Sequence, residues 1–244
     1  MNASKPILIS TLAFLSISAK CIAETKHDST INEALKETIL TAITKYETTN
    51  INEWAFEVSR YEFEEGTETS SIERFSPHGD DSSKWQLISI NQRLPTPKEQ
   101  ETFKRNKNKS GTNISMNLRD LILTDSLTVE KQSQTSVYAT FDVYLEQLGS
   151  KASNSLRGYL TYDSQEAYIT DIEITNTKSF SPMFAATLDN INLQLAFIKI
   201  NDTVLTERVN LEMTGRFAIF SKLDERSSDI YSNYQYVGQC KFNC

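Results

Sequence analysis

The side chains that could carry out chemistry are few and scattered in this sequence. The chain of 244 residues contains two histidines and three cysteines, and it lacks a Gly-x-Ser-x-Gly elbow, a His-Glu-x-x-His motif and a phosphate-cradling glycine-rich loop. His78 stands in a His-Gly-Asp-Asp loop that has too few spaced oxygens for a calcium loop. Glu62 and Glu64 fall on one face of an expected strand, whereas glycosidase carboxylates face each other across a cleft. We therefore predict that the protein is not an enzyme, and we expect no catalytic residue, no cofactor and no metal site.

The cysteines near the end of the chain are candidates for a disulfide. Cys240 and Cys244 follow the last expected strand and have three residues between them. Redox motifs usually have two intervening residues at the start of a helix, so we expect no dithiol redox site here. An oxidising compartment would allow the two to pair. A terminal disulfide, free thiols and an intermolecular disulfide all remain open.

The first 23 residues have the three parts of a secretory signal peptide. Lys5 supplies the positive start, 7–19 form a mostly apolar run, and Cys21 and Ala23 are the small residues before the cleavage site. As a helix, the apolar run would span about 20 Å, which is too short for a bilayer core of about 30 Å. We expect cleavage near Ala23 and a periplasmic or secreted protein, with an uncleaved N-terminal anchor as the alternative. No later stretch is apolar enough to predict a transmembrane segment in the mature chain.

The distribution of charge limits the partners that we expect. The chain carries a net charge of −7, and nucleic-acid binding needs a basic surface, so we expect no nucleic-acid partner. One basic cluster consists of Lys104, Arg105, Lys107 and Lys109. It lies near the end of an expected helix that begins with the N-cap Thr96, Pro97 and the capping-box residue Glu99. The cluster either complements the helix dipole or docks an anionic lipid headgroup or an acidic partner.

The hydrophobic pattern predicts one helix followed by many strands. Thr30 and Glu33 fit a capping box at the start of an amphipathic helix in the mature chain. After this helix the apolar residues alternate with polar ones, which is typical of half-buried strands. The expected strands are 54–63, 70–76, 85–90, 137–145, 156–162, 168–174, 191–197, 209–219 and 230–237. No helix of ten residues or more separates consecutive strands in the second half, which favours an antiparallel meander over a parallel sheet.

This pattern predicts an α+β fold in a single domain. We expect a strongly curled antiparallel sheet, which forms an unclosed half-barrel because strands twist, with the N-terminal helix and the inserted helix over its concave face. No linker divides the chain, so the domain should cover residues 24–239 and leave 240–244 as a cysteine-containing tail. The apolar residues expected on the concave face are Leu193, Leu195, Phe197, Leu211, Met213 and Phe217. They would either line a ligand site or form an ordinary core.

Two short stretches of the sequence, together with this layout, resemble known proteins. The stretches 85–99 (WQLISINQRLPTPKE) and 215–236 (GRFAIFSKLDERSSDIYSNYQY) resemble uncharacterised bacterial envelope proteins that are similar to the lipoprotein-carrier (LolA/LolB-like) superfamily. The resemblance implies an unclosed barrel that is covered by helices and holds acyl chains. No lipid-gating arginine or membrane-insertion residue of those carriers can be matched position by position.

From these observations we expect a non-catalytic periplasmic binding protein. Its half-barrel would hold an apolar ligand, such as a lipid or the acyl chain of a lipoprotein. The alternative is an interaction or scaffolding module of the cell envelope, with a solidly packed sheet and a partner protein docked on an edge strand or on the basic helix.

Overall fold

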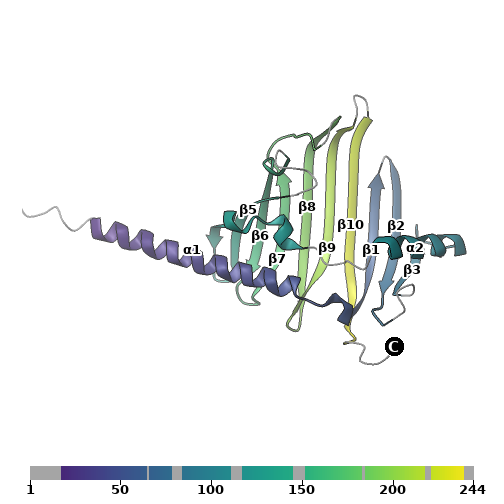
Figure 1. Ribbon diagram of the computed structural model, residues 1–244, viewed down its shortest axis with the longest axis horizontal. Helices are drawn as coiled ribbons and strands as arrows, with labels where there is room; N and C mark the ends of the chain where they lie inside the picture. Colours follow the sequence, from purple (N-terminus) through teal and green to yellow (C-terminus); the bar gives the residue numbers. More distant parts are fainter. Residues whose placement is uncertain are drawn as a thin grey trace, which may run out of the picture.

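The computed structural model describes residues 18–64, 66–78, 84–110, 117–144, 152–182, 185–217 and 221–238. A single antiparallel sheet carries helices on one of its faces (Figure 1). The helices are α1 (Ser18–Glu47), α2 (Pro97–Ser110) and α3 (Leu118–Leu121), with 3-10 turns η1 (Ile51–Glu53) and η2 (Thr124–Ser126). The strands are β1 (Trp54–Glu64), β2 (Thr67–Phe75), β3 (Trp85–Ile90), β4 (Thr128–Gln132), β5 (Ser136–Asp142), β6 (Leu156–Asp163), β7 (Tyr168–Asn176), β8 (Ala186–Ile200), β9 (Thr203–Phe217) and β10 (Ser221–Tyr236).

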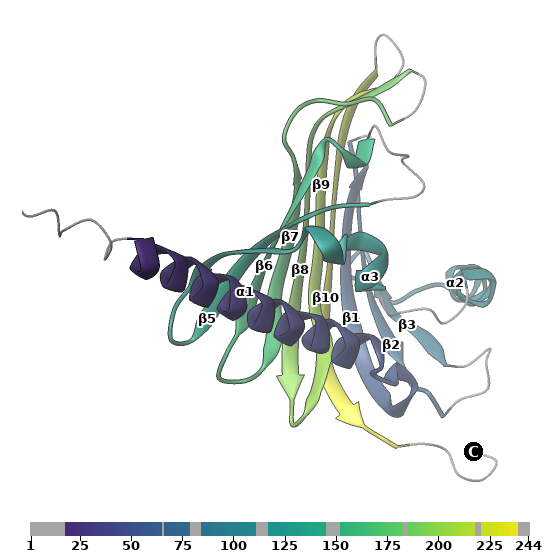
Figure 2. The ribbon, with the colours of Figure 1, turned by 60° about the vertical axis from the view of Figure 1, so that its left-hand side comes forward.

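The sheet is an open, curled meander. Its ten strands follow the order β3-β2-β1-β10-β9-β8-β7-β6-β5-β4, so the first and last strands of the chain are neighbours. β3 and β4 form the two edges, and the chain that connects them contains α2 and α3. Figure 2 shows the curvature of the sheet and the helices beside it. The expected α+β half-barrel with an N-terminal helix and an inserted helix is therefore confirmed.

Helix α1 crosses the concave face and closes the main core (Figures 1 and 2). Ile39, Ile43 and Tyr46 repeat at the spacing of one helix face and are buried against the sheet. The ring of Tyr46 meets Phe197 edge-on at 4.8 Å between centroids, and its hydroxyl lies 3.0 Å from the Thr206 Oγ1. These contacts fix the end of α1 above β8 and β9.

Two local predictions differ from the structure. The helix begins at Ser18, so Thr30 and Glu33 lie inside α1 and do not cap it. The sequence 18–29 contains no proline or glycine, so nothing local stops the helix from starting earlier. Strand β10 begins at Ser221 rather than near residue 230, and its first half is mostly polar. Because β1 and β9 flank this segment on both sides, backbone pairing extends β10 where side-chain alternation gives no signal.

Alternation along the strands divides the concave face into two regions. The larger region, over β5–β9, is apolar and is covered by α1 and α3. The smaller region lies over β1–β3 and contains a separate, mainly aromatic cluster of Phe56, Val58, Phe75 and Trp85. Phe103 of α2 packs on this cluster. Farther along β1 and β2, the same face becomes charged, and the candidate site lies there.

Candidate ligand-binding site

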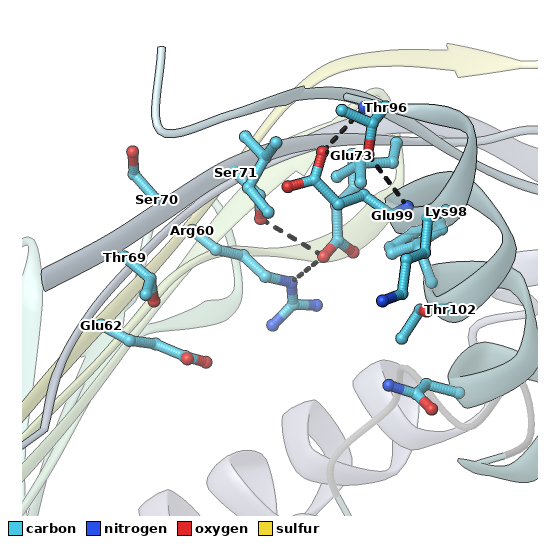
Figure 3. A pocket seen from close by; sticks show the side chains of 14 residues that line it. Arg60, Glu62, Thr69, Ser70, Ser71, Glu73, Thr96, Lys98, Glu99 and Thr102 are labelled. Atoms are coloured by element: carbon cyan, nitrogen blue, oxygen red, sulfur yellow. Dashed lines mark hydrogen bonds and ion pairs between the residues drawn. The ribbon is translucent and has the colours of Figure 1, made fainter. Parts of the chain in front are cut away.

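A cavity of about 660 Å³ lies between the concave face of β1–β3 and helix α2 (Figure 3). Every second residue of β1 and β2 contributes to its floor: Arg60, Glu62, Thr69, Ser71 and Glu73. β3 contributes Leu87 and Ile90, and α2 contributes Thr102, Phe103 and Asn106. Its volume falls in the range of roughly 300–1,000 Å³ that is typical of small-molecule sites. Its walls therefore offer an apolar side and a charged side to one ligand.

A buried ion network forms the charged side of the floor. Glu73 is only 5% exposed, and its Oε1 lies 3.1 Å from Arg60 Nε while its Oε2 lies 2.7 Å from Lys107 Nζ. A second ion pair joins Arg60 Nη1 to Asp229 of β10. The ammonium of Lys107 also lies 4.3 Å from the centre of the Trp85 ring, a cation–π contact. Because one carboxylate joins β2, β1 and α2, the network holds the helix over the sheet.

Burial and neighbouring charges compete within this network. Burial acts to lower the pKa of Arg60, but the carboxylates of Glu73 and Asp229 outweigh it, and the pKa of Arg60 is raised. Burial raises the pKa of Asp229, whereas the positive charge of Arg60 lowers it. The nearby carboxylates of Glu73 and Glu62 raise this pKa further. The guanidinium therefore remains charged, and the carboxylate of Asp229 is protonated more readily than an exposed one.

The start of α2 is held by the expected capping box. The backbone N–H of Thr96 donates to Glu99 Oε2 at 2.7 Å, and the N–H of Glu99 donates to Thr96 Oγ1 at 3.4 Å. Arg93 donates two hydrogen bonds to the same carboxylate, at 2.6 and 2.9 Å. Gln100 Nε2 donates to the carbonyl oxygen of Leu87 at 2.8 Å, which joins the helix to β3. The N-cap prediction is confirmed, and the helix forms one wall of the cavity.

The carboxylate of Glu99 should make the order of α2 depend on pH. Its pKa is lowered to about 2 by hydrogen bonds from Arg93 and Thr96. Because the folded-state pKa lies below the ordinary value of 4.5, this stabilisation is complete above about pH 4.5 and is lost as the pH falls through about 2. We expect the amide protection factors of α2 to decrease over that range. Glu99→Gln should reduce them already at pH 7, and equal protection in the two proteins at pH 7 would contradict this account.

The residues predicted to line a ligand site lie on the concave face but outside the large cavity. Leu195 and Phe197 are buried in the main core, and Leu193, Leu211 and Met213 are partly buried against it. Phe217 ends β9 and is 54% exposed. Leu195 and Phe197 border a smaller cavity of about 170 Å³, and Leu211 borders another of about 210 Å³. Their assignment as ligand contacts remains a prediction.

The side chains of the predicted basic cluster do not share one surface. Lys104 and Arg105 are exposed, whereas Lys107 turns inward to Glu73 and Trp85. Lys109 belongs to the last turn of α2, where only the backbone is described. Cys240 and Cys244 lie outside the described residues. In the part of the chain that was searched, no helix combines the length and apolarity needed to cross a membrane.

Sequence reasoning missed the two central residues of the floor. Arg60 follows Phe56 and Val58 on one face of β1, and Glu73 precedes Phe75 on the same face of β2. A charged residue that continues a buried apolar row is a signal for a paired charge, because an isolated charge would be costly there. The partner could not be identified from the sequence, since Lys107 is on a helix that begins more than twenty residues after Glu73.

Comparison with known proteins gives only distant likenesses. No protein-family model matches the chain, and no curated protein matches it. A solved DUF1329 family protein from Desulfovibrio piger is similar over 84% of this chain and 92% of its own, with 9% identity and a TM-score of 0.34. An isomerase-inactive variant of GphF DH1 is similar over 84% of this chain and 82% of its own, with 10% identity and a TM-score of 0.17. At these scores the likenesses carry no functional argument, so the proposal below rests on the cavity.

Proposed function

We propose that this protein is a non-catalytic binding protein of the periplasm or the extracellular space, and that it holds an amphiphilic lipid between the sheet and α2. The observation that carries the proposal is the cavity of about 660 Å³ with one apolar and one charged side. A LolA/LolB-like role, in which an unclosed barrel holds acyl chains, belongs to the same proposal. Lipid or the acyl chain of a lipoprotein would be the cargo.

The lining supports binding more than catalysis. Leu87, Ile90 and Phe103 supply apolar surface for an acyl chain, and burying such a chain yields about 0.8 kcal/mol per methylene. The two central titratable groups of the floor, Arg60 and Glu73, are engaged in ion pairs, and Glu73 is shared between Arg60 and Lys107. General acid–base catalysis needs a group that exchanges protons near the working pH at the reacting atom. We therefore assign the charges of the floor to holding α2 and orienting a ligand.

A blocked cavity tests this proposal. Thr69 lies on the floor, so Thr69→Trp should fill part of the space, whereas Ser59→Trp places the same ring on the opposite face of the neighbouring strand. We expect the uncharged probe N-phenyl-1-naphthylamine to bind the wild type with a gain in fluorescence. Thr69→Trp should weaken that binding at least ten-fold, and Ser59→Trp should leave it unchanged. Equal binding by the two tryptophan variants, or no binding by the wild type, would refute the proposal.

A further inference from the structure

The charges that line the large cavity are not all engaged. Arg60 is paired with Glu73 and Asp229, Glu73 also with Lys107, and Glu99 with Arg93. Two further lining charges, Glu62 and Lys98, make no ion pair with any side chain in the described ranges. One is an acid and the other is a base, and they come from different walls. Among the described lining residues, the cavity thus presents one free charge of each sign.

The two free charges face a common space. Glu62 lies two residues after Arg60 on the same face of β1, which places it about 6.6 Å farther along the strand. Lys98 lies in the first turn of α2, on the opposite wall. In Figure 3 the side chains of Glu62 and Lys98 point into the cavity from its two sides, and the guanidinium of Arg60 lies between them. The two ion pairs of Arg60 use Nε and Nη1, and neither uses Nη2.

This arrangement disfavours a ligand with charge of only one sign. A purely anionic headgroup would meet Glu62, and the carboxylates of Glu73 and Asp229 already offset the charge of Arg60. A purely cationic headgroup would meet Lys98 and Arg60. Like charges that meet in the cavity repel each other. Each such contact weakens binding by about as much as a contact between opposite charges strengthens it. A headgroup with both charges can match both walls.

We propose that the cavity recognises a zwitterionic headgroup of the phosphoethanolamine type. The ammonium faces Glu62, and the phosphate faces Lys98 and the Nη2 of Arg60, because a guanidinium and an ammonium are the usual phosphate ligands. The charges come from separate walls, so they suit an ammonium and a phosphate joined by a short linker better than an amino acid with both charges on one carbon. The acyl chains lie against Leu87, Ile90 and Phe103. This inference rests on the proposed function and adds the class of ligand.

Short-chain lipids test the headgroup preference separately from lipid binding. Dihexanoyl phosphatidylethanolamine, dihexanoyl phosphatidylglycerol and dihexanoylglycerol share their acyl chains and differ in charge. Their binding to the full protein is measured by displacement of N-phenyl-1-naphthylamine, with free phosphoethanolamine as a fourth competitor. We expect dihexanoyl phosphatidylethanolamine to bind about five-fold more tightly than dihexanoyl phosphatidylglycerol. This is the effect of about one exposed charge pair.

Three variants connect that preference to the two charges. Glu62→Gln should abolish it without changing the affinity for dihexanoylglycerol. Lys98→Gln should weaken both phospholipids about five-fold and leave dihexanoylglycerol unchanged. Glu64→Gln is the matched control, because Glu64 is the next residue on that face of β1 and does not line this cavity. It should behave as the wild type.

The possible failures are distinguishable. If phosphatidylglycerol binds as tightly as phosphatidylethanolamine, or if Glu62→Gln retains the preference, the headgroup proposal is wrong while lipid binding stands. If free phosphoethanolamine binds as tightly as the lipid, the ligand is a small polar molecule and the amphiphile proposal is wrong. If none of the three lipids displaces the probe, the proposed function fails as well.

Discussion

Replacement of Glu73 by alanine should lower the free energy of unfolding by about 3 kcal/mol. The variant removes a 5% exposed carboxylate that pairs with both Arg60 and Lys107, and it leaves Lys107 above Trp85 without the carboxylate that it contacts at 2.7 Å. Breaking a buried ion pair by deleting one partner typically costs about 3–5 kcal/mol. We expect the lower end because Arg60 retains Asp229. Urea unfolding with a common m-value measures the change.

An exposed pair provides the control for this prediction. Asp142 and Arg157 form an ion pair at 2.7 Å, but their side chains are 57% and 36% exposed. Asp142→Ala should cost no more than about 1 kcal/mol, because exposed pairs gain little over hydration. If Glu73→Ala proves as mild as Asp142→Ala, Glu73 does not hold α2 on the sheet. Faster amide exchange in α2 of the Glu73 variant, with little change in β6, would locate the loss at the cavity.

The second large effect is expected in the main core, at Phe141. This ring is fully buried and lies over Gly158 on the paired strand β6. A Cβ added to Gly158 would come within 2.1 Å of Phe141 Cε2, so the glycine makes room for the ring. Phe141→Ala should lower the free energy of unfolding by about 3–5 kcal/mol through loss of burial and a residual cavity. Gly158→Ala alone should cost about 1–3 kcal/mol through overpacking.

The double variant shows whether the two residues act as one unit. In Phe141→Ala with Gly158→Ala, the added methyl group enters the space that the ring has vacated. The combined loss should therefore be smaller than the sum of the single losses by about 1 kcal/mol or more. Additive losses would show that the contact between ring and glycine does not determine the packing of β5 against β6.

The strands and the single open sheet were predictable because the sequence alternates strongly. The runs 137–145, 191–197 and 209–219 each place apolar residues on one face, and the structure has them in β5, β8 and β9 with that face toward the core. The capping box at Thr96 and Glu99 was equally local and was found correctly. Most of the fold could therefore be predicted from alternation with a period of two residues and from short capping motifs.

Features that depend on distant pairing were not predictable. The polar first half of β10 is a strand because β1 and β9 supply its hydrogen bonds, and β4 is a short edge strand with exposed side chains. The floor of the cavity has the same origin. Arg60 and Asp229 are 169 positions apart and meet only because β1 pairs with β10. The apolar rows predicted as lining pack mainly against the core, while the large cavity formed where charged rows follow an aromatic cluster.

Native mass spectrometry tests the central claim most directly. The protein is expressed from its full sequence in a bacterial host, purified without detergent, incubated with phospholipid vesicles and separated from them before measurement. The account predicts an added mass that extracts as a lipid, that persists in Ser59→Trp and that is reduced in Thr69→Trp. A bare mass for the wild type, or the same added mass in both tryptophan variants, would contradict a lipid held between the sheet and α2.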